Sequence, residues 1–126
     1  MYSFSKLNKK QKEAVTTIDG PVMILAGAGS GKTRVITERI SYLIDKKHVS
    51  PKQILAVTFT NKAAEEMRAR IKKILSADNL GVYVSTFHSL GVNLLRKSIH
   101  LLGYKSNFII YDSKDQYAVI KSIIDD

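Results

Sequence analysis

The stretch VMILAGAGSGKTRVITERI, residues 22–40, decides the expected fold of this chain of 126 residues. Residues 22–25 form a short apolar run between an Asp-Gly-Pro turn and a glycine cluster, which is typical of a strand buried on both faces. From Gly31 to Ile44 apolar side chains recur at helical spacing. The residues AGAGSGKT, 26–33, join the two elements. A glycine-rich turn between a strand and a helix predicts a phosphate-binding loop.

Each part of this loop has a chemical role toward a nucleotide. The glycines let successive backbone N–H groups point at phosphate oxygens, and the positive end of the following helix adds to the anion site. Lys32 would reach the β- and γ-phosphates, and the Thr33 hydroxyl would ligate the Mg²⁺ that accompanies a nucleotide triphosphate. Ala26 stands where glycine is usual, but alanine is small enough to keep the geometry. A glycine turn with no ligand is the alternative, and Gly31-Lys32-Thr33 favours nucleotide binding over it.

The rest of the chain continues the alternation of strands and helices. Such alternation predicts βαβ units and a mainly parallel sheet, and therefore the α/β class. The expected elements are a helix capped by Asn8 and ending near Thr17, a strand over 54–59, a helix over 62–75 capped by Asn61, a strand over 82–85, a helix over 87–102 ended by Gly103, a fourth apolar run over 108–111 and a last helix from Ser113.

Composition excludes several classes of protein. There are 20 Lys and Arg against 11 Asp and Glu, and the resulting charge of +9 favours a polyanionic partner. No cysteine is present, which excludes a disulfide framework and a thiolate site. No apolar run approaches the roughly 18–20 residues of a membrane span, and residues 1–12 do not resemble a secretory signal. We therefore expect a cytoplasmic protein that does not enter membranes.

Two turns carry a nucleic-acid signal. Thr58–Lys62 and Ser85–Ser89 follow expected parallel strands, so both turns and the phosphate loop should meet at one sheet edge. Hydroxyls and helix N–H groups there suit the phosphates of a nucleic acid, and Phe59 and Phe87 could stack on bases. The alternatives are that both rings belong to the core and that His88 is structural. A basic run at Arg68, Arg70, Lys72 and Lys73 is most simply a solvated helix face.

Asp112 has two interpretations. It follows the apolar run 108–111, as a Mg²⁺-binding carboxylate of an NTPase would, but Asp112-Ser113 is also a helix-capping sequence, which we favour. The first interpretation would suit a complete small P-loop phosphotransferase. A third possibility is a nucleic-acid-binding module that holds nucleotide without hydrolysing it.

Four motifs together resemble superfamily 1 DNA helicases of the Rep/UvrD/PcrA group. They are Leu7-Asn8-x-x-Gln11, AGAGSGKTR (26–34), AVTFTNKAAEEMRAR (56–70) and STFHSL (85–90), and in that group Ala26 is normal. The stretch GYKSNFIIYDSKDQ, 103–116, is most similar to the Rep branch. The resemblance implies an ATP-driven 3′-to-5′ translocase on single-stranded DNA that opens duplex junctions in replication restart or repair.

The same resemblance implies an architecture and a set of site residues. Residues 1–105 would be the front of a RecA-like P-loop domain, a parallel sheet flanked by helices, and 106–126 the start of an inserted helical subdomain. Gln11 would hydrogen-bond adenine, a pairing that favours ATP over GTP. The expected nucleotide ligands are Gln11, Ala26, Gly27, Ala28, Gly29, Ser30, Gly31, Lys32, Thr33 and Arg34. The expected DNA contacts are Phe59, Asn61, Lys62, Thr86, Phe87 and His88.

The family's acidic motif, arginine finger and second RecA-like domain normally come later in the chain. We therefore expect these 126 residues to be a truncated part of a longer protein and to lack ATPase activity alone. An open sheet edge would also favour self-association of such a piece.

Overall fold

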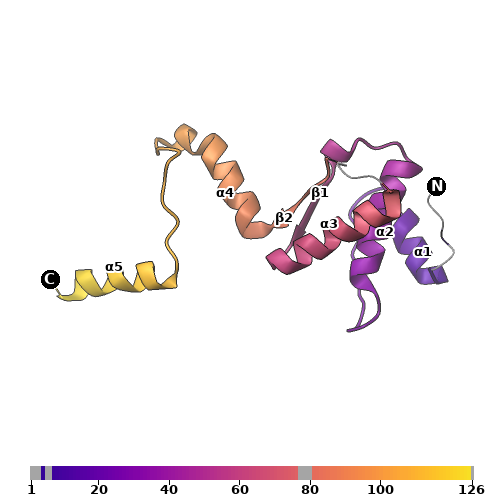
Figure 1. Cartoon of the computed structure of the whole chain (residues 1–126), viewed down its shortest axis with the longest axis horizontal. Coiled ribbons are helices and arrows are strands. Elements are labelled where there is room, and N and C mark those ends of the chain that lie inside the picture. Colours follow the sequence, from indigo (N-terminus) through magenta and orange to yellow (C-terminus); the bar gives the residue numbers. More distant parts are fainter. Residues whose placement is uncertain (1–3, 5–6, 77–80, 126) are drawn as a thin grey trace. The chain divides into compact units, whose positions relative to one another are not determined.

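The computed structural model describes residues 4, 7–76 and 81–125, which form two units, residues 1–87 and 88–126 (Figure 1). The first unit holds the elements around the phosphate loop. They are α1 (Lys9–Thr16), α2 (Lys32–Asp45), the 3-10 turn η1 (Pro51–Gln53), β1 (Leu55–Thr58), α3 (Asn61–Leu75) and β2 (Tyr83–Thr86). The second unit holds most of α4 (Phe87–Ser98), the 3-10 turn η2 (Ile99–Leu102) and α5 (Ser113–Asp125).

Helix α1 begins at the Asn8 cap that the sequence predicts, and the structure shows that the cap is reciprocal. The Asn8 side chain accepts from the Gln11 N–H at 2.9 Å, and the Gln11 side chain accepts from the Asn8 N–H at 3.0 Å. Two N–H groups that the helix cannot satisfy internally are thereby paired. The expected cap at Asn8 is confirmed.

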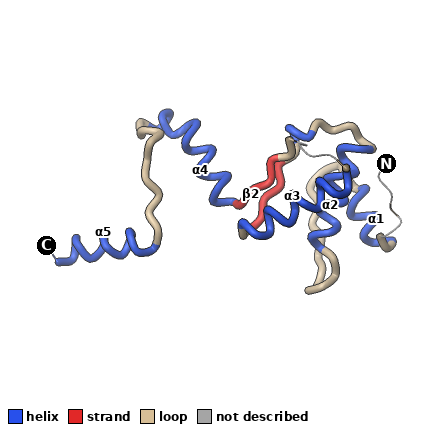
Figure 2. Tube along the Cα trace, in the orientation of Figure 1, coloured by secondary structure: helices blue, strands red, loops and turns tan. Residues whose placement is uncertain are grey.

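Strands β1 and β2 form a parallel pair connected through α3 (Figure 2). Leu55 lies opposite Tyr83, and Thr58 opposite Thr86. Parallel neighbours need a crossover connection, which α3 supplies. The α/β class is therefore confirmed by a βαβ unit.

Helix α3 is capped one residue earlier than expected. The sequence predicts Asn61 as the cap, but Thr60 has the extended backbone of a cap residue, and its Oγ1 accepts from the Ala63 N–H at 3.1 Å. Asn61 is instead the first helical residue. Threonine and asparagine both cap well, so composition could not choose between adjacent candidates.

The core of the first unit consists of two apolar clusters. The first joins α2 and α3 to the sheet through Ile40, Ala56, Ala64, Met67, Ile71 and Val84. The second joins α1 to α2 through Leu7, Val15 and Val35. Because Lys32 is the first residue of α2, the burial of Val35 and Ile40 also anchors the helix that begins at the phosphate loop.

The expected strand at residues 22–25 is wrong for the described structure. This segment has no strand assignment, and the described sheet contains β1 and β2. Met23 is 81% exposed and Leu25 85% exposed, while Ile24 packs against the second cluster. The apolar run has the composition of a doubly covered strand, but a strand exists only where a neighbour pairs with its backbone.

The second unit is helical. The expected helix over 87–102 divides into α4 and η2, and Gly103 ends it with φ of 79°. Glycine adopts this left-handed backbone conformation more readily than other residues do, because it has no Cβ. The apolar run 108–111 forms no strand, and the last helix begins at Ser113 as expected. Within the described ranges, no helix has the length and apolar character to cross a membrane.

Candidate functional site

The phosphate loop curls through two glycines with positive φ. Gly29 has φ of 73° and Gly31 has φ of 87°, values at which a side chain is strained. Between them, the Ser30 backbone N–H donates to the Gly27 carbonyl at 3.3 Å, and the Ser30 hydroxyl donates to the same oxygen at 2.6 Å. Gly31 directly precedes α2, so the turn delivers the loop to the positive end of that helix.

Lys32 folds back across the loop that precedes it. Its Nζ donates to the carbonyl oxygens of Ala26 at 2.8 Å and Gly27 at 2.7 Å. The ammonium group is thus held at the loop by neutral acceptors, and the side chain is exposed. An incoming phosphate would offer anionic acceptors in their place, which bind an ammonium more strongly.

Gln11 links α1 to the phosphate loop. Its Nε2 donates to the Ser30 carbonyl at 3.2 Å, while its Oε1 belongs to the α1 cap. A cavity of about 200 Å³ lies beside this link. Its lining residues come from α1 and its cap, the segment after Pro21, the loop and the start of α2; they are Asn8, Lys10, Gln11, Ala14, Ile24, Leu25, Ala26, Ser30, Lys32 and Val35. Such a mixture of apolar walls and a few polar groups is typical of ligand pockets.

Two further expected nucleotide ligands, Thr33 and Arg34, lie in the first turn of α2. Thr33 is exposed there, and its backbone carbonyl accepts from the Thr37 hydroxyl at 3.1 Å. The Nε atom of Arg34 lies 3.9 Å from Oε1 of Glu38, one turn further along the helix. Arg34 is therefore oriented by its own helix.

Arg39 is a positioning residue that sequence reasoning missed. From α2 it donates to the Ala14 carbonyl at 2.8 Å and also to the Thr17 carbonyl, at the end of α1. The last carbonyls of a helix need outside donors, so some partner was predictable. Its identity was not, since Arg39 lies 25 residues from Ala14 along the chain. Arg39 therefore holds the end of α1 to α2, while Gln11 holds the start of α1 to the phosphate loop.

Phe59 and Phe87 lie side by side at the carboxyl ends of β1 and β2. Their ring centroids are 5.5 Å apart with an interplanar angle of 48°. Phe59 is 88% exposed and Phe87 50% exposed, so the interpretation of both rings as core residues is wrong in this structure. The parallel register, with Thr58 opposite Thr86, brings the two rings together.

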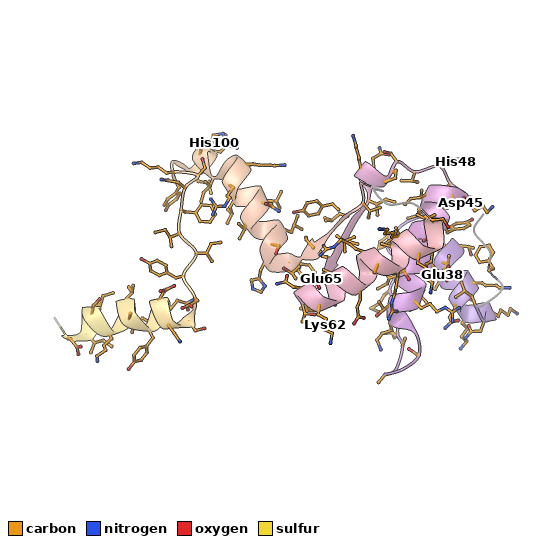
Figure 3. All side chains as sticks on the ribbon, viewed as in Figure 1. Glu38, Asp45, His48, Lys62, Glu65 and His100 are labelled. Atoms are coloured by element: carbon orange, nitrogen blue, oxygen red, sulfur yellow. The ribbon has the colours of Figure 1, made fainter. Side chains whose placement is uncertain are left out.

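The remaining expected DNA contacts differ in accessibility. Asn61 and Lys62 are exposed in the first turn of α3, where Figure 3 labels Lys62. His88 is exposed in α4, whereas Thr86 is buried. The sheet brings the two turns together, but it does not carry the phosphate loop to the same edge, because residues 22–25 are not one of its strands.

The basic run on α3 is only partly a solvated face. Arg68 Nη1 donates to the Val84 carbonyl at 2.7 Å, which ties α3 to β2. Arg70 lies 3.6 Å from Glu66 one turn away. The interpretation as a merely solvated face is therefore wrong for Arg68, which stabilises the βαβ unit.

Asp112 is the cap of α5. Its Oδ1 accepts from the N–H groups of Lys114 at 2.7 Å and Asp115 at 2.9 Å, and the Asp115 carboxylate accepts from the Asp112 N–H at 3.0 Å. The backbone N–H groups of Asp115 and Lys114 lower the pKa of the Asp112 carboxyl below its ordinary value. The favoured capping interpretation is confirmed.

Comparison with known proteins identifies the family. Residues 7–126 match the family described as the UvrD/REP helicase N-terminal domain. The chain belongs to this family.

Three relatives are named as ATP-dependent DNA helicase PcrA. The protein from Bacillus subtilis (strain 168) is 54% identical over 120 residues, which cover 95% of this chain and 16% of the relative. Proteins from Staphylococcus epidermidis (strain ATCC 12228) and Staphylococcus aureus (strain NCTC 8325) are 52% and 51% identical to this chain over 118 residues. Each of the two alignments covers 94% of this chain and 16% of the relative. The chain thus spans about one sixth of the length of these relatives, and its closer resemblance to the Rep branch stays a prediction.

Acidification should weaken the start of α5. The pKa of the Asp112 carboxyl is lower in the folded protein than in the unfolded chain, so its ionised form stabilises the fold at pH values above the unfolded-state pKa. This stabilisation is lost as the pH falls through the folded-state pKa. We expect NMR shifts of Lys114–Gln116 to lose helical character on acid titration. In Asp112→Asn, an uncharged cap remains, and the part of the titration due to Asp112 should disappear. An unchanged titration in the variant would contradict this assignment.

Proposed function

We propose that this chain is the N-terminal, ATP-binding part of an ATP-dependent DNA helicase that moves 3′ to 5′ along single-stranded DNA. The observation that carries the proposal is the phosphate loop whose Lys32 folds back over Ala26 and Gly27 at the start of α2. Membership of the UvrD/REP helicase N-terminal domain family and the names of the PcrA relatives support it.

The proposed architecture is larger than the described sheet. Residues 1–105 would belong to a RecA-like P-loop domain, and 106–126 to the start of an inserted helical subdomain. Two parallel strands with exposed apolar residues at 22–25 suit a sheet that continues elsewhere in a longer protein. A second RecA-like domain would then supply the opposite wall of the nucleotide cleft, and a piece without that wall should not turn over ATP.

The residues present fit a magnesium nucleotide. Lys32 supplies an exposed ammonium held at the loop, the first turn of α2 supplies N–H groups without helical acceptors, and the pocket beside Gln11 has room for a planar base. Thr33, exposed beside Lys32, would hold Mg²⁺, which would offset the charge of the phosphates. Arg34 would lie by the nucleotide. Gln11 has a second Nε2–H that the Ser30 contact leaves for adenine.

The exposed rings suit single-stranded DNA. Phe59 and Phe87 offer two neighbouring aromatic surfaces, and bases of any sequence can stack on such surfaces. Asn61, Lys62 and His88 would contact the phosphates around them, and Thr86 would support the turn from its buried position. Nucleotide could drive movement only if it binds unequally to two arrangements of the motor, since equal affinity shifts no equilibrium.

Partners and location follow from the same proposal. Single-stranded DNA and duplex junctions are the proposed substrates, with replication restart or repair as the setting. The PcrA relatives are bacterial, so we place this protein in the cytoplasm, where bacterial DNA lies. The phosphotransferase alternative loses its candidate carboxylate, because Asp112 caps α5.

Lys32→Ala should weaken MgATP binding by the full-length protein about 10- to 100-fold, because a hydrogen bond to a charged group contributes about 1.5–3 kcal/mol. Isothermal titration measures the affinity. Lys46→Ala, at the other end of α2 beside Asp45, is the matched control and should bind like the wild type. Equal affinity in both variants would exclude the loop as the nucleotide site.

Phe59→Ala and Phe87→Ala should each weaken single-strand binding by about 1–3 kcal/mol, the contribution of one stacked base. Fluorescence anisotropy with a labelled oligonucleotide measures the loss. Tyr117→Ala removes a similarly exposed aromatic ring from α5 and serves as the control. If both phenylalanine variants fold and bind DNA like the control, the stacking role is rejected.

A further inference from the structure

A separate basic surface lies entirely within residues 88–126. It is a shallow, widely open pocket, called the basic pocket below, formed by the end of α4, η2 and the loop after Gly103. Its lining residues are Arg96, His100, Tyr104, Lys105, Ser106 and Asn107, and Figure 3 labels His100. None of these residues belongs to the motifs that predict ATP or DNA contacts.

Arg96 is held in place in the wall of this basic pocket. Its Nη1 donates to the Ser106 carbonyl at 3.3 Å, and its guanidinium carbon lies 5.1 Å from the centre of the Phe108 ring. One carbonyl and one ring leave most of the five N–H donors of a guanidinium available. An arginine fixed in this way loses less side-chain entropy when it binds an anion than a free one does.

The charge of the segment favours an anionic ligand. Residues 88–111 contain Arg96, Lys97 and Lys105 but no aspartate or glutamate. The next carboxylate in the chain, Asp112, is already bonded to the N–H groups of α5. The pocket therefore combines a planar cation, an ammonium, a hydroxyl and an amide without a competing acidic side chain, which is a donor set for phosphate oxygens.

We propose that the basic pocket binds a backbone phosphate of DNA, as a contact point separate from Phe59 and Phe87. This inference rests on the proposed function, since DNA is the polyanion on which such a protein would act. Arg96 and Lys105 would contact the phosphate oxygens directly. Tyr104, whose side chain is 68% exposed at the rim, would pack against the adjoining sugar or base. A phosphate contact of this kind adds affinity and fixes the path of the strand without reading its sequence.

The salt dependence of binding tests the proposal. Each phosphate contact adds about 0.7 to the slope of log K against log salt for single strands and about 0.9 for duplex. We expect Arg96→Ala and Lys105→Ala, each in the full-length protein, to lower this slope by the value of one phosphate contact. The fall should be seen with single-stranded DNA, with duplex DNA or with both. Lys121→Ala removes an exposed charge from α5 and controls for net charge. A single-stranded oligonucleotide, a blunt duplex and inorganic phosphate are the three probes.

The outcomes separate this inference from the proposed function. A lowered slope on one DNA form in both pocket variants, but not in Lys121→Ala, supports a backbone contact and shows which form occupies it. Slopes equal to that of the wild type, or an equal fall in Lys121→Ala, overturn the proposal. Phosphate binding that is lost in the variants while both DNA slopes stay unchanged also overturns it, in favour of a free-phosphate site. If the wild type binds neither DNA, the proposed function itself fails.

Circular dichroism of each variant keeps the test decisive. Arg96 has structural contacts to Ser106 and Phe108, so Arg96→Ala could disturb the loop. Lys105 has an exposed side chain. If only Arg96→Ala loses helix content, the Lys105→Ala slope alone decides the result.

Discussion

The backbone of Gly31 is the constraint on which the candidate nucleotide site depends. Its φ of 87° lets the chain turn from the phosphate loop directly into α2, and a Cβ there would lie 3.4 Å from Nε2 of Gln11. Three contacts converge on this junction: Gln11 holds Ser30, Lys32 returns to Ala26 and Gly27, and the Val35 N–H begins the helical ladder on Gly31. The conformation of one glycine thus brings α1, the loop and α2 to the same pocket.

Local signals made much of this fold predictable. Caps at Asn8 and Asp112, the helical spacing of α2 and the glycine after η2 all depend on residues within a few positions of each other. Predictions that needed a distant partner were less successful. Residues 22–25 have the composition of a buried strand, but composition does not supply a pairing neighbour, and the described sheet contains none for them. Arg39 and Arg68 bond to carbonyls 25 and 16 residues away, which no local pattern indicates.

The candidate sites show the same division. The phosphate loop is a continuous motif, so its residues could be named from the sequence together with the role of each backbone group. The pairing of Phe59 with Phe87 needed the parallel register of β1 and β2, although the resemblance to superfamily 1 helicases had already singled out both residues. The basic pocket around Arg96 could not be foreseen, because it depends on how the chain folds back after Gly103. In physical terms, the proposed nucleotide site is encoded mainly in one continuous loop, whereas the proposed DNA contacts depend on tertiary structure.

In the proposed function, ATP binding at the phosphate loop serves movement on DNA. The most direct measurement is the steady-state rate of ATP hydrolysis by the full-length protein, with and without a single-stranded oligonucleotide. We expect the single strand to raise this rate severalfold, because strand and nucleotide would favour the same closed arrangement of the motor. An ATP hydrolysis rate that is the same with and without DNA, in a protein shown to bind both ligands, would contradict the proposed function.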